Sequence, residues 1–239
     1  MRYLILSDIH ANWEALNAVL DHAKGSYDEI LNCGDIVGYG PDPNLVVDWC
    51  RTQTSKIVRG NHDKACATLE HLEWFNPVAA QSARWTHANL TPQNLEYLVA
   101  LPTGPIIVEE LELSHGSPED EDEYLVYPDE IGAAAAHLGH RVAFFGHTHV
   151  QGCYIIHRGM AKRLMMDTVD LEPDCTYMIN PGSVGQPRDR NPRAAYALYD
   201  SSRRFVEMRR VEYAIPATQA KIIQAGLPEV LAQRLTLGR

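Results

Sequence analysis

The sequence predicts an α/β fold with two mixed β-sheets. In the first part of the chain, short apolar runs typical of strands alternate with segments typical of helices. Residues 3–6 and 30–33 are such runs, and residues 13–22 and 45–50 follow them as helices. Alternation of this kind implies a parallel sheet. Beyond residue 150, short strand-like runs between Gly, Pro and Asp turns favour a second, mixed or antiparallel sheet that packs on the first.

In the first half of the chain, glycine and proline residues mark where the expected strands and helices end or begin. Gly34 and Gly60 close two of the expected strands. From about residue 64 to 104 the pattern becomes helical, and two or three helices are expected there. Pro77 and Pro92 fit first-turn positions in two of them.

The second half is expected to begin with strands at residues 106–113 and 141–145, separated by a helix at 128–138. Residues 218–237 carry apolar side chains at helical spacing, interrupted near Gly226. This pattern indicates a pair of helices that covers the core, with a dimerisation arm as the alternative. The remaining strands are expected at residues 153–157, 163–167, 176–179, 195–199 and 205–211.

Length and charge narrow the classes of function. The 239 residues suit one domain that spans 1–239. With 21 Lys and Arg against 31 Asp and Glu, the formal net charge is -10, and a field of this sign opposes polymeric nucleic acid. The first strand starts too early for a cleaved signal peptide, and no apolar run approaches the roughly 18 residues of a membrane span. A cytoplasmic protein without a membrane partner is therefore expected.

Five short motifs follow strand-like runs and contain Asp, His or Asn. Loops at the carboxyl ends of neighbouring strands converge on one edge of an α/β sheet. Carboxylate and neutral imidazole are ligands for borderline divalent metals, so these loops could surround a two-metal site. The motifs are SDIHAN at 7–12, CGDIVG at 33–38, GNHD at 60–63, SHG at 114–116 and GHTH at 146–149. Together they predict a metal-dependent phosphoesterase.

The order of these motifs resembles the calcineurin-like metallophosphoesterase superfamily, whose pattern is D-x-H, G-D, G-N-H-D/E, a lone H and G-H-x-H. The resemblance extends from Asp8 to His149, and NPGSVGQPR at 180–188 is similar to bacterial and archaeal members. It implies a four-layer α/β/β/α sandwich. Relative to the shortest members, the helical stretch at about 64–104 would be an insertion.

The resemblance also implies which residues bind metal. Asp35 would bridge two divalent cations, since a carboxylate can use both oxygens to hold them roughly 3.5–4 Å apart around a shared hydroxide. Manganese is the expected metal, with Fe, Zn, Co and Ni as alternatives for a mixed nitrogen and oxygen shell. One ion would be held by Asp8, His10, Asp35 and His149, and the other by Asp35, Asn61, His115 and His147.

His62 would be the general acid that protonates the departing oxygen, because an imidazole titrates near pH 6.5. The alternative is that His62 only orders its loop. In the protein Ser/Thr phosphatase branch, an Asp that supports this His and an Arg that grips phosphate follow the G-D motif, but this chain has Gly38 and Tyr39 there. Asp63 is therefore assigned to the catalytic group as the partner of His62, with Asp42 or a water as alternatives.

Two residues are assigned to substrate binding. Asn12 matches a family position whose amide donates to a phosphoryl oxygen, although an N-cap role for the next helix fits it equally well. Arg59, or else Arg188, would replace the missing phosphate-binding guanidinium. The aromatic side chains of the helical stretch, which could stack on a base or aryl group or simply pack in the core, are Trp74, Phe75 and Trp85.

These residues predict a phosphoric ester hydrolase, of the phosphatase or phosphodiesterase type, that acts on a small phosphorylated substrate such as a nucleotide. A dinucleoside polyphosphate hydrolase and a phosphoprotein phosphatase are the alternatives. From a different class, a non-catalytic scaffold with the same fold is the rival. A homo-oligomer stays open, because one amphipathic tail does not decide the oligomeric state.

Overall fold

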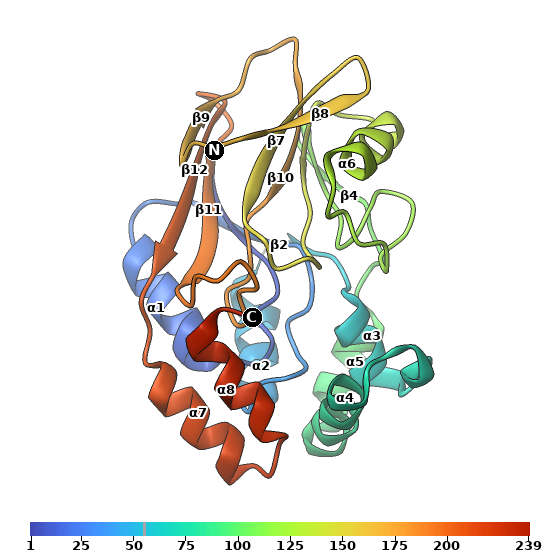
Figure 1. The fold of residues 1–239 in the computed structure, drawn as a ribbon, viewed down its shortest axis with the longest axis vertical. Coiled ribbons are helices and arrows are strands. Elements are labelled where there is room, and N and C mark those ends of the chain that lie inside the picture. The colour runs from blue at the N-terminus through green and yellow to red at the C-terminus, as the bar shows by residue number, and fades with distance from the viewer. Residues whose placement is uncertain (55) are drawn as a thin grey trace.

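The computed structural model describes residues 1–54 and 56–239. Within them, two six-stranded mixed sheets pack face to face and helices cover their outer sides (Figure 1). The first sheet has the order β3-β2-β1-β11-β12-β9, with β1 (Arg2–Leu6), β2 (Glu29–Asn32), β3 (Lys56–Ile57), β9 (Thr168–Asp170), β11 (Ala194–Asp200) and β12 (Phe205–Val211). The second has the order β4-β5-β6-β10-β7-β8, with β4 (Ile106–Val108), β5 (Leu111–Leu113), β6 (Val142–Phe144), β7 (Gly152–His157), β8 (Met160–Leu164) and β10 (Thr176–Asn180). The predicted four-layer α/β/β/α sandwich is confirmed.

The helices form the outer layers and one end of the molecule. The first two pack on the first sheet, whereas α6 packs on the second. The helices are α1 (Trp13–Ala23), α2 (Pro43–Gln53), α3 (Asn61–Thr68), α4 (Pro77–Asn89), α5 (Pro92–Val99), α6 (Pro128–Ala134), α7 (Ile215–Gln224) and α8 (Glu229–Leu237), with 3-10 turns at Leu72–Trp74 and Ala135–His137. Among the described residues, no helix has the length and apolar character that crossing a membrane requires.

Strand β1 shows why the sheets stack. Its side chains alternate between the two faces, as the period of a strand demands. Leu4 and Leu6 pack toward the helices, whereas Tyr3 and Ile5 face the second sheet. Both faces are buried, which explains why the run is continuously apolar.

The parallel strands position the functional loops. Strands β1, β2 and β3 run parallel to one another, as do β5 and β6 in the other sheet. Each of the five sequence motifs begins within three residues of the end of one of these strands. The carboxyl ends of parallel strands share one edge, so the motifs of each sheet meet there.

Two expected strands are corrected. Residues 106–113 form not one strand but the antiparallel pair β4 and β5, because the chain turns at Glu109, where φ is 53°. The strand expected at 163–167 is wrong, since β8 ends at Leu164 and Met165 and Met166 are exposed to solvent. Their apolar character is typical of strands, but no core lies beside them.

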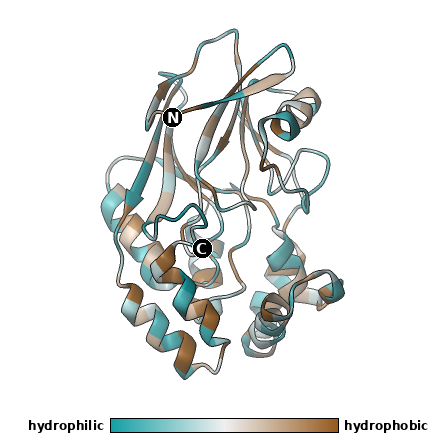
Figure 2. Ribbon diagram, viewed as in Figure 1, coloured by the Kyte–Doolittle hydropathy of each residue, from teal (hydrophilic) through white to brown (hydrophobic). Residues whose placement is uncertain are grey.

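The C-terminal segment forms the expected pair of helices. α7 and α8 are separated at Gly226, whose φ of 70° favours glycine. Their apolar residues, including Leu231 and Leu235, pack in one cluster with Tyr39 and α4. In Figure 2 both helices carry hydrophobic and hydrophilic residues in alternation, as helices on a surface do. The pair therefore covers the core, and the role of a dimerisation arm stays a prediction.

Candidate metal centre

The backbone is strained at most of the candidate ligands. Five of the seven have a left-handed φ between 48° and 66°, where few residues other than glycine are found. Such a conformation costs of order 1–3 kcal/mol and is concentrated at functional sites. The five are Asp8, His10, Asp35, His147 and His149. None is a glycine, so the sequence carried no signal of this strain.

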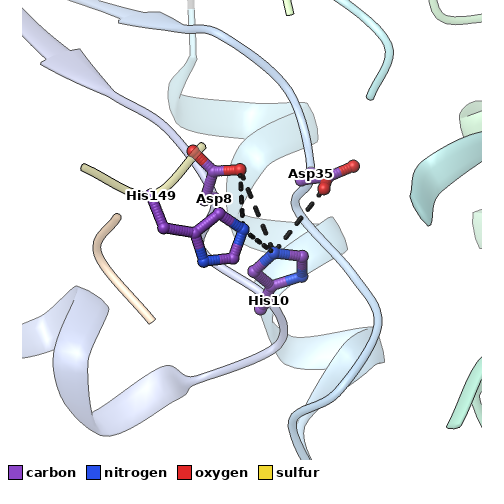
Figure 3. A group of neighbouring side chains, drawn as sticks. All are labelled: Asp8, His10, Asp35 and His149. Atoms are coloured by element: carbon purple, nitrogen blue, oxygen red, sulfur yellow. Dashed lines mark hydrogen bonds and ion pairs between the residues drawn. The ribbon is translucent and has the colours of Figure 1, made fainter. Parts of the chain in front are cut away.

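A first group of ligand atoms contains the four residues predicted for one metal. Asp8, His10, Asp35 and His149 are all buried, and their ligand atoms lie within 4.8 Å of one another. His10 Nε2 is 3.1 Å from His149 Nε2, and His149 Nε2 is 3.3 Å from Asp8 Oδ1. Figure 3 shows these side chains converging from separate loops.

A second group contains the residues predicted for the other metal. Asp35, His115 and His147 are buried, with ligand atoms within 4.8 Å. His115 Nε2 lies 3.1 Å from His147 Nδ1 and 3.2 Å from Asn61 Oδ1. The structure therefore brings all seven candidate ligands together in two adjoining groups.

Asp35 belongs to both groups through a single oxygen. Its Oδ2 lies 3.6 Å from His10 Nε2 and 3.4 Å from His115 Nε2. Its Oδ1 accepts the backbone N–H of His62 at 2.8 Å. Oδ2 is thus the oxygen of Asp35 that faces both groups, and the use of both oxygens as a bridge stays a prediction.

The imidazoles are oriented by backbone carbonyls. In each ring one nitrogen faces a carbonyl oxygen, which fixes the tautomer and leaves the other nitrogen free to bind a cation. These contacts are His10 Nδ1 with Val37 O at 2.9 Å, His115 Nδ1 with Cys33 O at 2.7 Å, His147 Nε2 with Asp122 O at 3.2 Å and His149 Nδ1 with Gln186 O at 2.6 Å. Residues outside the five motifs, such as Gln186 of the segment 180–188, thus orient the ligands.

The donor set fits divalent cations. Asp8 Oδ1 and Asp35 Oδ2 are buried and have no hydrogen-bond partner within residues 1–54 and 56–239. A buried oxygen without a partner is costly, and a cation would satisfy both. Carboxylate oxygens with imidazole nitrogens, and no thiolate, suit Mn, Fe, Zn, Co or Ni.

The pKa values of two candidate ligands also agree with a site for a divalent cation. Burial, together with the charge of Asp35, raises the pKa of Asp8 to about 7. Burial alone would lower the pKa of His115, but the Asp35 carboxylate raises it to about 10. A proton on His115 thus balances the buried negative charge, and a divalent cation could take its place.

His62 lies beside the first group in an aromatic enclosure. Its ring centre is 5.0 Å from His10, 4.3 Å from Tyr39 and 5.0 Å from Phe75. Burial lowers the pKa of His62 well below its usual value. In the part of the chain that the structure describes, no side chain or backbone group bonds to its Nδ1.

Asp63 connects the metal loops and does not orient His62. Its carboxylate accepts the backbone N–H groups of Asp35, Ile36, Val37 and Gly60 at 2.9–3.1 Å. Asp42, the other carboxylate considered, binds Lys221 Nζ at 2.8 Å. The expected orientation of His62 by a carboxylate is therefore not found. Asp63 is a positioning residue instead.

Asn12 is the N-cap of α1, which was the alternative to its predicted role in substrate binding. Its Oδ1 accepts the N–H of Ala15 at 3.2 Å, and its Nδ2 donates to Gly185 O at 2.9 Å. Thr218 also bonds to Oδ1. Substrate binding by Asn12 is therefore corrected, because its amide is fully used inside the protein.

The two candidate arginines differ in their surroundings. Arg59 forms a bidentate ion pair with Glu121, at 3.1 and 2.7 Å, and is not free to hold phosphate. Arg188 lies over the ring of Tyr39, 5.7 Å from its centre, and its Nη2 donates to Gln186 Oε1. In the part of the chain that the structure describes, the Nε of Arg188 is buried without a hydrogen-bond partner. Burial lowers the pKa of His149, and the positive charge of Arg188 lowers it further. Arg188 therefore replaces Arg59 as the guanidinium near the centre.

Comparison with known proteins agrees with this geometry. A family model described as the calcineurin-like phosphoesterase superfamily domain matches residues 1–204. An uncharacterized protein of Methanocaldococcus jannaschii is 38% identical over 250 residues, which cover 98% of this chain and 97% of that protein.

Solved structures show the same fold over the full length. A metallophosphoesterase from Sphaerobacter thermophilus is 40% identical, with a TM-score of 0.90 and coverage of 100% of this chain and 99% of that one. A hypothetical protein from Pyrococcus horikoshii, 21% identical, has a TM-score of 0.81 with coverage of 100% and 98%, and supports the fold alone. With the motifs, the fold and the two ligand groups in agreement, the chain belongs to the calcineurin-like phosphoesterase superfamily.

Proposed function

We propose that this protein hydrolyses phosphoric esters of small molecules with the help of two divalent cations, manganese first among them. The acidic net charge of -10 favours a small substrate over a polyanion. The nitrogen and oxygen donor set supports a metal of the Mn to Zn series. We also retain the cytoplasmic location as a proposal.

One observation carries the two-cation proposal. The buried Oδ2 of Asp35 faces a nitrogen of each ligand group and has no hydrogen-bond partner in the described chain. An oxygen shared in this way suits two cations better than one. When bound, such cations would neutralise phosphoryl charge and make water a stronger nucleophile at neutral pH.

The protein's own groups then handle the departing oxygen and the phosphoryl group. His62 Nδ1 is enclosed, so Nε2 is the nitrogen that would donate a proton to the leaving group. The negative charge of the bound phosphoryl group would have to offset the lowering of the His62 pKa by burial. The guanidinium of Arg188 would hold a phosphoryl oxygen, since it needs an anionic partner and lies near the ligands. Asp63 would keep Asp35 in place through the backbone.

The test combines metal counting with a substrate panel. The protein is purified with Mn²⁺, and bound metal is measured by mass spectrometry of the elements. Turnover is then measured on p-nitrophenyl phosphate, bis-p-nitrophenyl phosphate, a 2′,3′-cyclic nucleotide and a diadenosine polyphosphate. About two equivalents of metal and turnover of at least one ester are expected. Asp35→Asn should lose both, because it removes the shared oxygen's charge.

The panel also decides between the alternatives. Preference for the monoester, the diesters or the diadenosine compound separates a phosphatase, a phosphodiesterase and a dinucleoside polyphosphate hydrolase. Less than one equivalent of metal, with no turnover, would favour the non-catalytic scaffold and contradict our proposal.

A further inference from the structure

A cleft of about 300 Å³ opens directly on the second ligand group. Asn61, His62 and His147 are among its lining residues, so the cleft adjoins the candidate metal centre. Its walls include Trp74, Phe75 and Tyr124. This volume is at the lower end of the range that small-molecule ligands occupy.

One wall carries an exposed aromatic ring next to a ligand. The ring of Tyr124 lies 3.8 Å from that of His147, measured between centres, yet half of the tyrosine side chain is exposed. No helix or strand includes Tyr124, so it projects from a loop. If a phosphate were bound at the candidate metal centre, a planar group attached to it on this side would contact the ring of Tyr124.

Two further aromatic side chains, Phe75 and Trp74, line the cleft. Phe75 contacts the ring of His62 edge-on, with centres 5.0 Å apart at 78°. Next to it, Trp74 stacks on His71, with centres 4.5 Å apart at 15°. The short 3-10 turn that bears Trp74 is anchored by Leu72, which is buried.

Trp74 differs from the other aromatic residues of this region. Phe75 and Trp85 pack against the hydrophobic clusters, so core packing accounts for both. Trp74 is 72% exposed and belongs to none of these clusters. Trp74 thus lines the cleft without a place in the hydrophobic core, which leaves its ring available to a ligand.

We propose that this cleft binds a planar aromatic group of nucleobase size that is carried by the substrate phosphate, with Trp74 as the stacking platform. The proposal rests on the proposed function and names its substrate class, a mononucleotide or a related small phosphoester. Stacking between a base and an aromatic side chain tolerates any base, because every base has a π-face. The acidic net charge disfavours a polymer in the same cleft.

Equilibrium binding to the protein with Mn²⁺ tests this assignment. Isothermal titration calorimetry compares adenosine 5′-monophosphate with glycerol 3-phosphate, each used as its methylenephosphonate analogue, which cannot be hydrolysed. The two ligands differ in the base. Wild-type protein should bind the nucleotide about 10-fold more tightly. Trp74→Ala should abolish that preference and leave glycerol 3-phosphate unaffected, whereas Trp74→Phe should keep most of it. Tyr127→Ala is the control, because Tyr127 is 63% exposed and lies outside the cleft.

Three results would overturn the assignment. The wild type could show no preference for the nucleotide, Trp74→Ala could weaken both ligands equally, or the same variant could dissociate an oligomer in size-exclusion chromatography. The last result would make Trp74 part of an interface between copies. Because binding is read without turnover, a Trp74-dependent preference in a protein that hydrolyses no ester would refute only the proposed function.

Discussion

Asp35 and Asp63 are both buried carboxylates, but their surroundings give them different roles. Asp63 has backbone N–H donors on both oxygens, so its charge is satisfied by the protein. Asp35 has such a donor on Oδ1 only, and Oδ2 is left toward the imidazoles. Asp35 therefore has an oxygen available to a cation, whereas both oxygens of Asp63 already have donors.

His62→Ala should slow the cleavage of alkyl phosphates about 100-fold and affect nitrophenyl phosphates much less. A nitrophenolate needs little protonation as it leaves, whereas an alkoxide needs a general acid. Steady-state kcat on both ester classes, with equal metal content in wild type and variant, measures the difference. Equal losses on both classes would show that His62 only orders its loop.

The metal-free protein should lose stability as the pH rises from 7 to 9. The Asp35 carboxylate raises the pKa of His115 to about 10 despite burial, so the folded protein holds a proton that the unfolded chain releases. The loss cannot exceed about 1.4 kcal/mol per pH unit for this one group. Urea unfolding in the presence of a chelator gives the slope. His115→Gln should flatten it, and an unchanged slope in this variant would contradict the assignment.

At the scale of elements, the functional loops follow parallel strands and are held by other loops. The loop after β10 provides Gln186, which orients His149, and Arg188, which lies beside Tyr39. Asn180, at the end of that strand, donates to Gly146 O and so connects this loop to the GHTH motif. The segment after β10 is thus part of the centre, although it holds no predicted ligand.

Arg188→Gln should reduce kcat/KM about 100-fold, the loss typical of removing one group that stabilises charge in the transition state. Arg59→Gln is the matched control, because its guanidinium pairs with Glu121. It should change kcat/KM less than threefold and cost at most about 1 kcal/mol of stability. The reverse order of effects would restore Arg59 as the phosphate-binding residue.

Sequence reasoning predicted the loops better than the side chains within them. The motifs after β1 and β2 place Asp8 and Asp35 together because strand direction determines where each loop emerges. That Asn12 and Arg59 already have partners within the protein could not be predicted, because these partners, Gly185 and Glu121, lie far away in the sequence. Distant partners leave no local pattern. The edge strand β9 was missed for a different reason, because three residues are too few to show the period of a strand.

At the scale of the whole molecule, the candidate metal centre joins the two sheets. The first ligand group takes Asp8, His10 and Asp35 from loops of the first sheet and His149 from a loop of the second. The second group is likewise shared, with His115 from the other sheet. A cation in either group would therefore hold both halves of the sandwich together.

Mn²⁺ at 100 times its Kd should raise the melting temperature by roughly 10–20 °C when both sites are filled. Each filled site adds about 2.7 kcal/mol at that concentration, and 1 kcal/mol corresponds to about 2–4 °C for a protein of this size. Differential scanning fluorimetry with and without a chelator measures the shift. Asp35→Asn should show little of it, and a full shift in that variant would place the cations elsewhere.

The left-handed backbone at the ligands reverses a familiar rule of mutagenesis. At His147, where φ is 66°, an alanine would retain the unfavourable backbone geometry, but a glycine would relieve it. In urea unfolding, His147→Gly should therefore have a free energy of unfolding about 1 kcal/mol higher than that of His147→Ala. Glycine is normally the more disruptive replacement. If the alanine variant were the more robust of the two, the loop would not hold that conformation in solution. A more stable glycine variant would show that this protein tolerates backbone strain in order to orient its imidazoles.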